Sequence, residues 1–227
     1  EGAVRIFGIP LYVLPSPVQV AETLVQELPV LALHARVTVA EALAGVAISL
    51  VLALALGVLM DCFPMIRQGL YPVLVVTQTV PMIVLAPIFI IYMGFGAAPK
   101  ILTVVLMCFF PVAVSFSDGL SQVDAEYVHL VRSYGAGQWK TYCLVKIPAA
   151  VPALLSGLKV AATYSISGAV VGEWIGSQEG LGYYLLRVKN GYMLDKVFAC
   201  VLMIILLSLL MNGAVKLFGY AVLPSKR

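Results

Sequence analysis

Five long apolar runs restrict what this chain can fold into more than any other feature of its sequence. They cover residues 35–60, 70–93, 98–116, 149–171 and 195–222. Each reaches the length of about 20 residues that a helix needs to cross about 30 Å of hydrocarbon. Only 11% of the residues are charged, against about a quarter in soluble domains. The sequence therefore predicts an all-α, polytopic membrane helix bundle, because a helix satisfies its own backbone hydrogen bonds in lipid.

Residues 1–34 depart from this pattern because four prolines interrupt them. We interpret residues 1–34 as an external, proline-rich, amphipathic segment and residues 35–227 as the transmembrane domain. Within the first segment, residues 17–33 suit a short helix that lies at the membrane interface. The chain opens with neither a Met nor a basic leader, so we expect a further spanning helix upstream of Glu1.

The longest polar interruption between the apolar runs covers residues 121–148. Its first half carries apolar side chains at i, i+3, i+4 and i+7, namely Tyr127, Leu130, Val131 and Tyr134. That spacing predicts an amphipathic helix that is too short and too polar to span a membrane. A second helical run, residues 138–147, is expected to end at Pro148.

The ends of the amphipathic helix are marked as well. Ser121 and Asp124 have the spacing of a capping box. Asp124 and Glu126 fall in the first turn and Arg132 in the last, as the helix dipole favours. Gly135 follows as a left-handed stop. Such a capped, non-spanning helix in a membrane protein suggests a docking element or a helix that lies on the membrane surface.

Several classes of function lack their characteristic residues. The net charge is only +3 and the basic residues form no run, so no nucleic-acid partner is expected. The four cysteines are far apart, without a CxxC pair, and neither histidine has a ligand partner at helical spacing. No nucleophile motif, P-loop or glycine-rich nucleotide fingerprint occurs. We therefore expect no metal or cofactor in this chain, and any ATP-driven work must be done by another chain.

The spacing at the end of the polar stretch resembles a known family. Gly135 is followed, ten to thirteen positions later, by Val145-Lys146-Ile147-Pro148. This resembles the signature loop in permease subunits of bacterial ATP-binding-cassette (ABC) importers. The Glu-Ala-Ala triplet of that loop would fall on His129, Leu130 and Val131, so its acid is missing here, although Glu126 lies one turn away.

The resemblance implies that residues 121–148 form a cytoplasmic loop whose short coupling helix docks on an ATPase subunit. The residues that it places in this role are Asp124, Glu126, His129, Leu130, Arg132, Gly135, Ile147 and Pro148. A bare amphipathic helix on the membrane surface is the alternative. The two sides of the membrane carry seven and six basic residues, so the positive-inside rule does not decide which side is cytoplasmic. The orientation of the chain in the membrane therefore has to be inferred from the loop.

Other segments carry the resemblance over most of the chain. Leu14-Pro15-Ser16-Pro17, Gln78-Thr79-Val80-Pro81 and Phe109-Phe110-Pro111 resemble segments of the nitrate, sulfonate and taurine permeases. Residues 172–176 with residues 180–183 resemble the branch that handles pyrimidine precursors of thiamine. The resemblance thus implies a MetI-like permease fold with five spans in this chain and a sixth upstream.

The family resemblance also implies partners and a location. The chain would be a transport subunit, not an enzyme, and a multi-pass protein of the bacterial inner membrane. It would work with cytoplasmic ABC ATPase subunits that bind ATP and Mg, an extracytoplasmic binding protein and a second, identical permease chain. The expected solute is a thiamine pyrimidine precursor of the hydroxymethylpyrimidine type, with a sulfonate, nitrate or riboflavin as alternatives.

The distribution of charge bears on the solute. An anionic cargo favours a cavity lined by Arg, Lys or helix N-termini. With Lys100 assigned to the external side, the apolar stretches of the second and third spans hold no Lys or Arg, and the fourth holds only Lys159. This favours a neutral heterocycle. Lys159 itself suits either a structural contact or snorkelling to the headgroups, and we expect Glu41 at the membrane interface rather than in a pathway.

Polar residues inside the second and fourth spans are the pathway candidates. Gln78 and Thr79 precede Pro81 in a proline-interrupted helix, where backbone often lines a cavity; a kink satisfied by neighbouring helices is the alternative. In the fourth span, Tyr164 and Ser165 offer hydroxyl groups. We assign Ser167, with Gly168, to helix packing.

Glu173 and Trp174 end the fourth span and are the candidates for an external gate. Glu173 suits either a gate or a contact with the binding protein, and Trp174 suits an interfacial anchor. The glycine-rich residues 180–184 suit either a re-entrant turn or an ordinary external loop.

Two other function classes compete with an importer subunit. A secondary transporter or channel needs an intramembrane ion relay or an internal inverted repeat, and the sequence shows neither. A membrane enzyme needs clustered His, Asp or Glu side chains, which are also lacking from the sequence.

Overall fold

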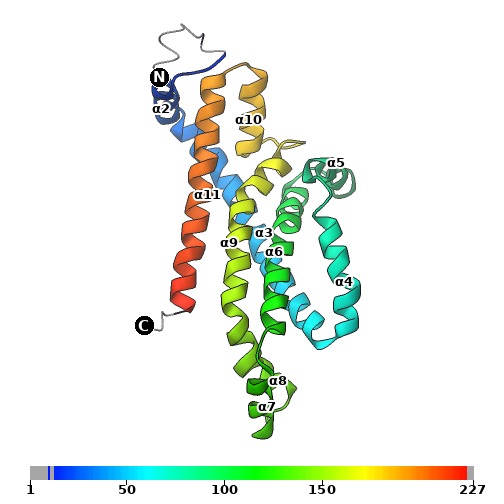
Figure 1. Cartoon of the computed structure of the whole chain (residues 1–227). Coiled ribbons are helices and arrows are strands. Elements are labelled where there is room, and N and C mark those ends of the chain that lie inside the picture. Colours follow the sequence, from blue (N-terminus) through cyan, green and yellow to red (C-terminus); the bar gives the residue numbers. More distant parts are fainter. Residues whose placement is uncertain (1–9, 11–12, 224–227) are drawn as a thin grey trace.

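The computed structural model describes residue 10 and residues 13–223, and within this range the regular elements are helices (Figure 1). Four long apolar helices run along the molecule: α3 (Leu28–Cys62), α6 (Ala97–Ser121), α9 (Ile147–Glu173) and α11 (Leu194–Val222). Each is long and apolar enough to cross a membrane. The all-α, multi-pass prediction is therefore confirmed.

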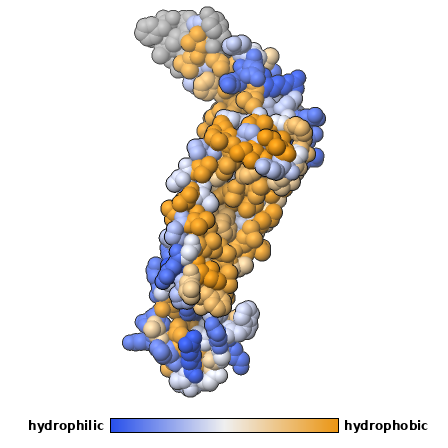
Figure 2. Space-filling view, turned by 90° about the vertical axis from the view of Figure 1, so that its right-hand side faces the viewer, coloured by the Kyte–Doolittle hydropathy of each residue, from blue (hydrophilic) through white to orange (hydrophobic). Residues whose placement is uncertain are grey.

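The molecule is an elongated bundle with an apolar middle and polar ends. On the face shown in Figure 2, hydrophobic surface covers the middle and hydrophilic surface gathers mainly towards both ends. One end carries α7 (Ala125–Ser133) and α8 (Gln138–Thr141), and the other carries α2 (Pro17–Gln26) and α10 (Leu181–Asn190) (Figure 1). We call these the α7 end and the α10 end.

Helix α6 forms the centre of the bundle and packs along both α3 and α9. Small residues permit this close packing. A side chain at Gly157 of α9 would place its Cβ 2.5 Å from the carbonyl oxygen of Pro111 in α6. A Cβ at Gly57 of α3 would lie 2.5 Å from the Phe116 ring. Helices in lipid gain affinity from such close packing because apolar burial alone provides little driving force there.

The first helices begin and end at other residues than the sequence predicted. Helix α2 ends at Gln26 and α3 already begins at Leu28, so α3 passes through residues 34 and 35, where we placed the domain boundary. Pro29 lies in the first turn of α3, where the missing N–H of a proline costs nothing. Pro29 therefore lies at the start of a helix, whereas the sequence analysis treated it as an interruption. Residues 1–9 of the predicted external segment lie outside the described residues.

The second predicted span is a broken helix. Helices α4 (Pro64–Thr77) and α5 (Met82–Met93) meet at 101°. The sequence predicted a proline-interrupted span over residues 70–93, and the interruption is a sharp bend between two helices, the first of which already begins at Pro64. Pro81 caps the start of α5. A proline lacks an N–H and disfavours helical backbone at the residue before it, so the chain turns there.

The segment between α9 and α11, which we expected to be a loop, contains α10. The side chains of Leu181, Tyr184 and Val188 are buried and belong to the main hydrophobic core. Helix α10 thus packs back against α11, α9 and α3 at its end of the bundle.

Candidate functional site

Helix α7 has a well-defined start, but not the predicted one. Asp124 is its N-cap, and the carboxylate accepts a 2.9 Å hydrogen bond from the Glu126 N–H. The predicted capping box between Ser121 and Asp124 is wrong. Ser121 is the last residue of α6, and its hydroxyl donates to the Asp118 carbonyl oxygen. Because α6 continues to Ser121, this residue is not available as the N-cap of α7.

Gly135 ends α7 as predicted. Its φ is +81°, in the left-handed region. The Gly135 N–H donates to the Arg132 carbonyl oxygen at 2.9 Å, and the Ala136 N–H donates to the Val131 carbonyl oxygen at 3.3 Å. These two bonds form a Schellman motif, which satisfies the last carbonyl groups of the helix.

The apolar face of α7 has no cover. The helix contains no buried residue. Tyr127, Leu130 and Tyr134 are 62%, 53% and 85% exposed, and Trp139 on the neighbouring α8 is 75% exposed. The predicted polar positions Glu126, His129 and Arg132 are exposed too. Clustered exposed apolar side chains with a polar surround are typical of a docking surface.

The helix after α8 does not stop at Pro148. A π-helical turn, Tyr142–Lys146, joins α8 to α9, and Pro148 lies in the first turn of α9. The Ile147 N–H donates to the Tyr142 carbonyl oxygen, five residues back. The wider π turn makes room for the proline ring, which would collide with the carbonyl group four residues earlier in a regular helix. The predicted stop at Pro148 is therefore wrong.

The π turn is clamped to the end of α3. The Tyr142 hydroxyl donates to the Asp61 carboxylate, and Lys146 Nζ lies 2.6 Å from the same oxygen. The Asp61 side chain is 6% exposed, and the Cys62 thiol donates to the Tyr142 oxygen at 3.2 Å. Sequence analysis missed this clamp. Its only signal was an acidic residue at the end of one span and a Lys 85 positions later.

The break between α4 and α5 contains the predicted pathway residues of the second span. Gln78 and Thr79 follow α4, Pro81 caps α5, and all three are exposed. The Gln78 side chain donates to the Leu106 carbonyl oxygen at 3.4 Å, and the Thr79 hydroxyl donates to the Val76 carbonyl oxygen. The break places polar groups beside α6 without burying them.

The structure separates the hydroxyl groups of the fourth span. Ser165 is fully buried, and its hydroxyl donates to the Ala162 carbonyl oxygen of its own helix. Tyr164 is 47% exposed and Ser167 is exposed. Gly168 packs against α6, so the glycine has the packing role that we assigned to it together with Ser167.

Glu173 lies at the centre of a buried network at the α10 end. Its carboxylate accepts hydrogen bonds of 2.6 Å from the Thr38 hydroxyl and of 2.6 Å from the Gly182 N–H. The Thr38 hydroxyl in turn accepts from the Leu181 N–H at 2.9 Å. Glu173 is 1% exposed, so its carboxylate is not on the surface in this structure. Trp174 is half-buried, and its Nε1 has no hydrogen-bond partner among the described residues.

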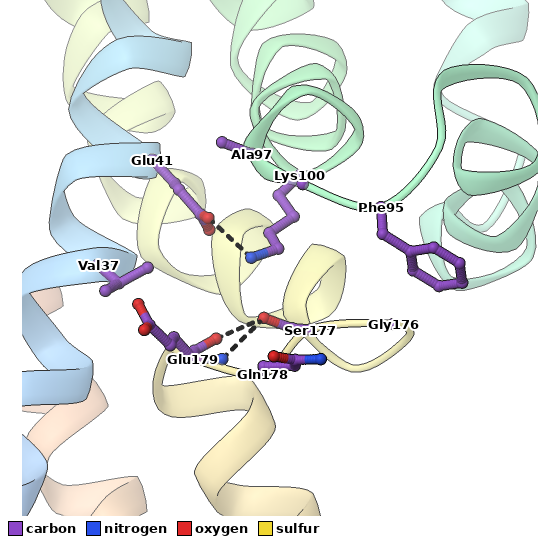
Figure 3. Close-up of a pocket in the computed structure, with 10 residues that line it drawn as sticks. Val37, Glu41, Phe95, Ala97, Lys100, Gly176, Ser177, Gln178 and Glu179 are labelled. Atoms are coloured by element: carbon purple, nitrogen blue, oxygen red, sulfur yellow. Dashed lines mark hydrogen bonds and ion pairs between the residues drawn. The ribbon is translucent and has the colours of Figure 1, made fainter.

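A pocket of about 760 Å³ opens next to this network (Figure 3). Glu41 of α3 and Lys100 of α6 form a 3.0 Å ion pair in it. Both are buried, at 5% and 8% exposure. The sequence analysis treated them separately, with Glu41 at the membrane interface and Lys100 on the external side, and did not pair them. Sequence analysis missed the pair because its members are far apart in the chain. Among the described residues, no three His, Cys, Asp or Glu side chains are grouped to hold a metal ion.

Comparisons with known proteins agree with this geometry. The family of binding-protein-dependent transport system inner membrane components matches residues 45–222. The chain is 35% identical, over its full length and 91% of the relative, to the formylaminopyrimidine transport permease protein ThiX of Halalkalibacterium halodurans. It is 30% identical, over 90% of its length and 75% of the relative, to the putative aliphatic sulfonates transport permease protein SsuC of Bacillus subtilis.

The fold also has a solved counterpart. A structure of the MetNI methionine ABC transporter in an inward-facing conformation matches with a TM-score of 0.72, over 86% of this chain and 98% of the other. At 17% identity, this match shows a shared fold alone. It agrees with the predicted MetI-like architecture.

Proposed function

This chain belongs to the family of binding-protein-dependent transport system inner membrane components, the permease subunits of ABC importers, and we propose that its cargo is a pyrimidine precursor of thiamine. It is a multi-pass membrane protein and a transport subunit, not an enzyme. The proposed cargo is supported by the full-length similarity to a formylaminopyrimidine permease. The similarity to a sulfonate permease is lower and covers less of both chains.

The proposed assembly contains two copies of this chain, two cytoplasmic ATPases that bind ATP and Mg, and an extracytoplasmic binding protein. The exposed apolar face of α7 is the observation that carries the proposed ATPase contact. A helix capped at both ends, with no residue buried in its own chain, is a preformed ridge for a partner groove. Glu126 supplies an acid one turn from His129, where the family pattern has its acidic residue.

The connections of α7 supply a route for movement. Closure of the ATPases would displace α7 and α8, and α8 continues through the π turn into α9. Because the Asp61 clamp joins that turn to α3, a displacement of α8 reaches α3 and α9 together. In this proposal Gln78, Thr79, Pro81 and Tyr164 remain pathway candidates because all four are exposed on this chain and can face a second chain or a solute.

The cargo is tested by reconstitution. The chain, its ATPase and its binding protein are placed in proteoliposomes, and ATP-dependent uptake of radiolabelled hydroxymethylpyrimidine and formylaminopyrimidine is measured against riboflavin, taurine and nitrate. Uptake of the pyrimidines is expected. Uptake of only one of the other solutes would overturn the cargo assignment and leave the permease assignment in place.

The coupling role is tested by a charge on the α7 face. We expect Leu130→Asp to abolish uptake and the stimulation of ATP hydrolysis by loaded binding protein, because a carboxylate cannot enter an apolar groove unpaired. Membrane insertion should be unchanged, because Leu130 is 53% exposed. Gln68→Asp places a new carboxylate on an exposed position of α4 and should retain both activities. Normal stimulated hydrolysis in Leu130→Asp would rule out docking through α7.

A further inference from the structure

The start of α10 is capped by side chains from two other helices. The N–H groups of residues 180–182 donate, in this order, to His34 Nδ1 at 3.2 Å, to the Thr38 hydroxyl at 2.9 Å and to the Glu173 carboxylate at 2.6 Å. His34 and Thr38 lie one turn apart on α3, and Glu173 is the last residue of α9. The first N–H groups of a helix have no partners within it, so these bonds fix the start of α10 to α3 and α9 at once. We call the side chains of His34, Thr38 and Glu173 the α10 cap.

The α10 cap is buried and bonded within itself. The Thr38 hydroxyl accepts from α10 and donates to the Glu173 carboxylate at 2.6 Å. Thr38 is 0% exposed and Glu173 is 1% exposed. A Cβ at Gly182 would lie 2.9 Å from the Glu173 Cβ, so the first turn of α10 sits directly against the end of α9. A displacement of α10 therefore has to move α3 and α9 or break these bonds.

The same two helices hold the short helices at the opposite end of the molecule. There the Asp61 carboxylate of α3 accepts from Tyr142 and Lys146 of the π turn, and the π turn joins α8 to α9. Figure 1 shows α7 and α10 at opposite ends of the bundle. Each end of the α3 and α9 pair is thus tied by polar side chains to a short helical segment.

Between the two ends, α3 and α9 pack closely against the same residue of α6. A Cβ at Gly45 of α3 would lie 2.4 Å from the Val104 side chain, and a Cβ at Gly168 of α9 would lie 3.3 Å from the Val104 Cα. Val104 is 0% exposed. Interiors packed this closely transmit a displacement, because few voids are present to absorb it.

We infer that the α10 cap passes the arrival of the binding protein to α3 and α9, and through them to the ATPase contact. In the proposed assembly the α7 end faces the cytoplasmic ATPases, so the α10 end faces the extracytoplasmic binding protein. Thr38 is the central positioning residue, because its hydroxyl joins α3 to both α9 and α10. Glu173 acts through α10 in this route, without touching a partner. The inference rests on the proposed function and assigns the route between its two partner sites.

The test compares basal ATP hydrolysis with hydrolysis stimulated by saturating, loaded binding protein in the proteoliposomes. The binding protein carries whichever solute these liposomes import, so a wrong cargo assignment does not affect the result. Thr38→Val removes the hydroxyl and keeps the shape of the side chain. It should reduce the stimulation about fivefold and leave basal hydrolysis unchanged, because it weakens the coupling between the two ends. A merely structural role would lower basal and stimulated hydrolysis in proportion, through the amount of folded protein.

Two matched variants control for the loss of a buried threonine. Thr38→Ser retains a hydroxyl and should keep the stimulation. Thr103 is also 0% exposed, but its hydroxyl donates to the Pro99 carbonyl oxygen of its own helix, α6. Thr103→Val should therefore keep the stimulation as well. A loss in Thr103→Val as large as that in Thr38→Val would overturn the inference.

His34→Phe tests the edge of the α10 cap and decides the question if Thr38→Val does not insert. It keeps an aromatic ring beside Tyr184 and removes the acceptor of the Gly180 N–H. The stimulation should fall about threefold, as expected for the loss of one hydrogen bond. Normal stimulation in His34→Phe and Thr38→Val, or a proportional loss of basal and stimulated hydrolysis, would overturn the inference. A natural chain that the binding protein does not stimulate would overturn the proposed assembly as well.

Discussion

Two glycine pairs with the same spacing lie at opposite ends of this molecule. Gly135 and Gly137 connect α7 to α8, and Gly180 and Gly182 lead into α10. The first glycine of each pair has a positive φ, +81° and +103°. Their surroundings are opposite. A Cβ at either glycine of the α7 end would meet nothing within 4 Å, whereas a Cβ at either glycine of the α10 end would overlap the Glu173 side chain or nearby backbone.

The difference separates a joint that is closed within this chain from a helix whose apolar face is uncovered. At the α10 end, Thr38, Glu173 and the backbone of Leu181 and Gly182 satisfy one another, and α10 buries its apolar face. At the α7 end, the caps are satisfied but the apolar face is open. Glycine pairs of the same spacing therefore lie in a closed internal joint at one end and beside an uncovered apolar helix face at the other.

Alanine at the second glycine of each pair tests this contrast most strongly. Gly182→Ala should destabilise the protein by about 3 kcal/mol or prevent its insertion, because the new Cβ would collide with the Val170 carbonyl oxygen. Gly137→Ala should leave the melting temperature nearly unchanged, because its surroundings are open. The measurement is thermal unfolding in detergent. Equal melting temperatures for the two variants would contradict the closed joint.

Neutralising one glutamate at each end gives a smaller effect. Glu173→Gln should reduce the free energy of unfolding by about 2 kcal/mol, because one of the two donors from Thr38 and Gly182 loses its acceptor. Glu126→Gln, in the exposed first turn of α7, should cost about 0.5 kcal/mol through the helix dipole. Denaturant titration in mixed micelles can compare them. A larger loss in Glu126→Gln would reverse the comparison.

Acid pH should affect the α10 end slightly. Glu27 lies between α2 and α3, and the hydrogen bond from Lys196 at 2.6 Å holds the pKa of its carboxyl below the ordinary value of 4.5. Ionised Glu27 therefore stabilises the fold above pH 4.5, and this contribution is lost as the pH falls through the lowered pKa. Because the pair is partly exposed, the contribution should be less than about 1 kcal/mol.

The pH effect is measured as the difference in melting temperature between the natural chain and Glu27→Gln, above and below pH 4.5. The difference should shrink on acidification. Glu22→Gln, at an exposed position of α2, should show no such convergence. A constant difference for Glu27→Gln would show that the Lys196 contact does not favour the ionised form.

Local patterns predicted most of the elements but not the conformation that the chain adopts at each proline. The long apolar runs predicted α3, α6, α9 and α11 because length and hydropathy are properties of each segment alone. Pro29 begins a helix, Pro81 turns the chain and Pro148 is accommodated by a π turn. From the sequence alone, each of these prolines is expected to interrupt a helix. Whether a proline begins a helix, turns the chain or is accommodated within a helix depends on where the neighbouring helices hold the chain.

The candidate coupling surface was predictable for the same reason. Gly135 acts on groups within a few residues, so its role at the end of α7 could be inferred from spacing. Asp124 also caps α7, but as its N-cap and not as the second partner of a capping box with Ser121. The Asp61 clamp and the Glu41–Lys100 pair join residues 85 and 59 positions apart. No local pattern indicates such pairs.

The sequence by itself determined that this protein is a membrane helix bundle with one capped, amphipathic polar loop, because hydropathy, capping and turn chemistry act over a few residues. Tertiary structure decided which polar groups are buried together. It turned Glu173 inward, paired Glu41 with Lys100 and left the α7 face uncovered. The physical reason is that burial and pairing depend on which helices lie side by side, and packing between distant segments sets that arrangement.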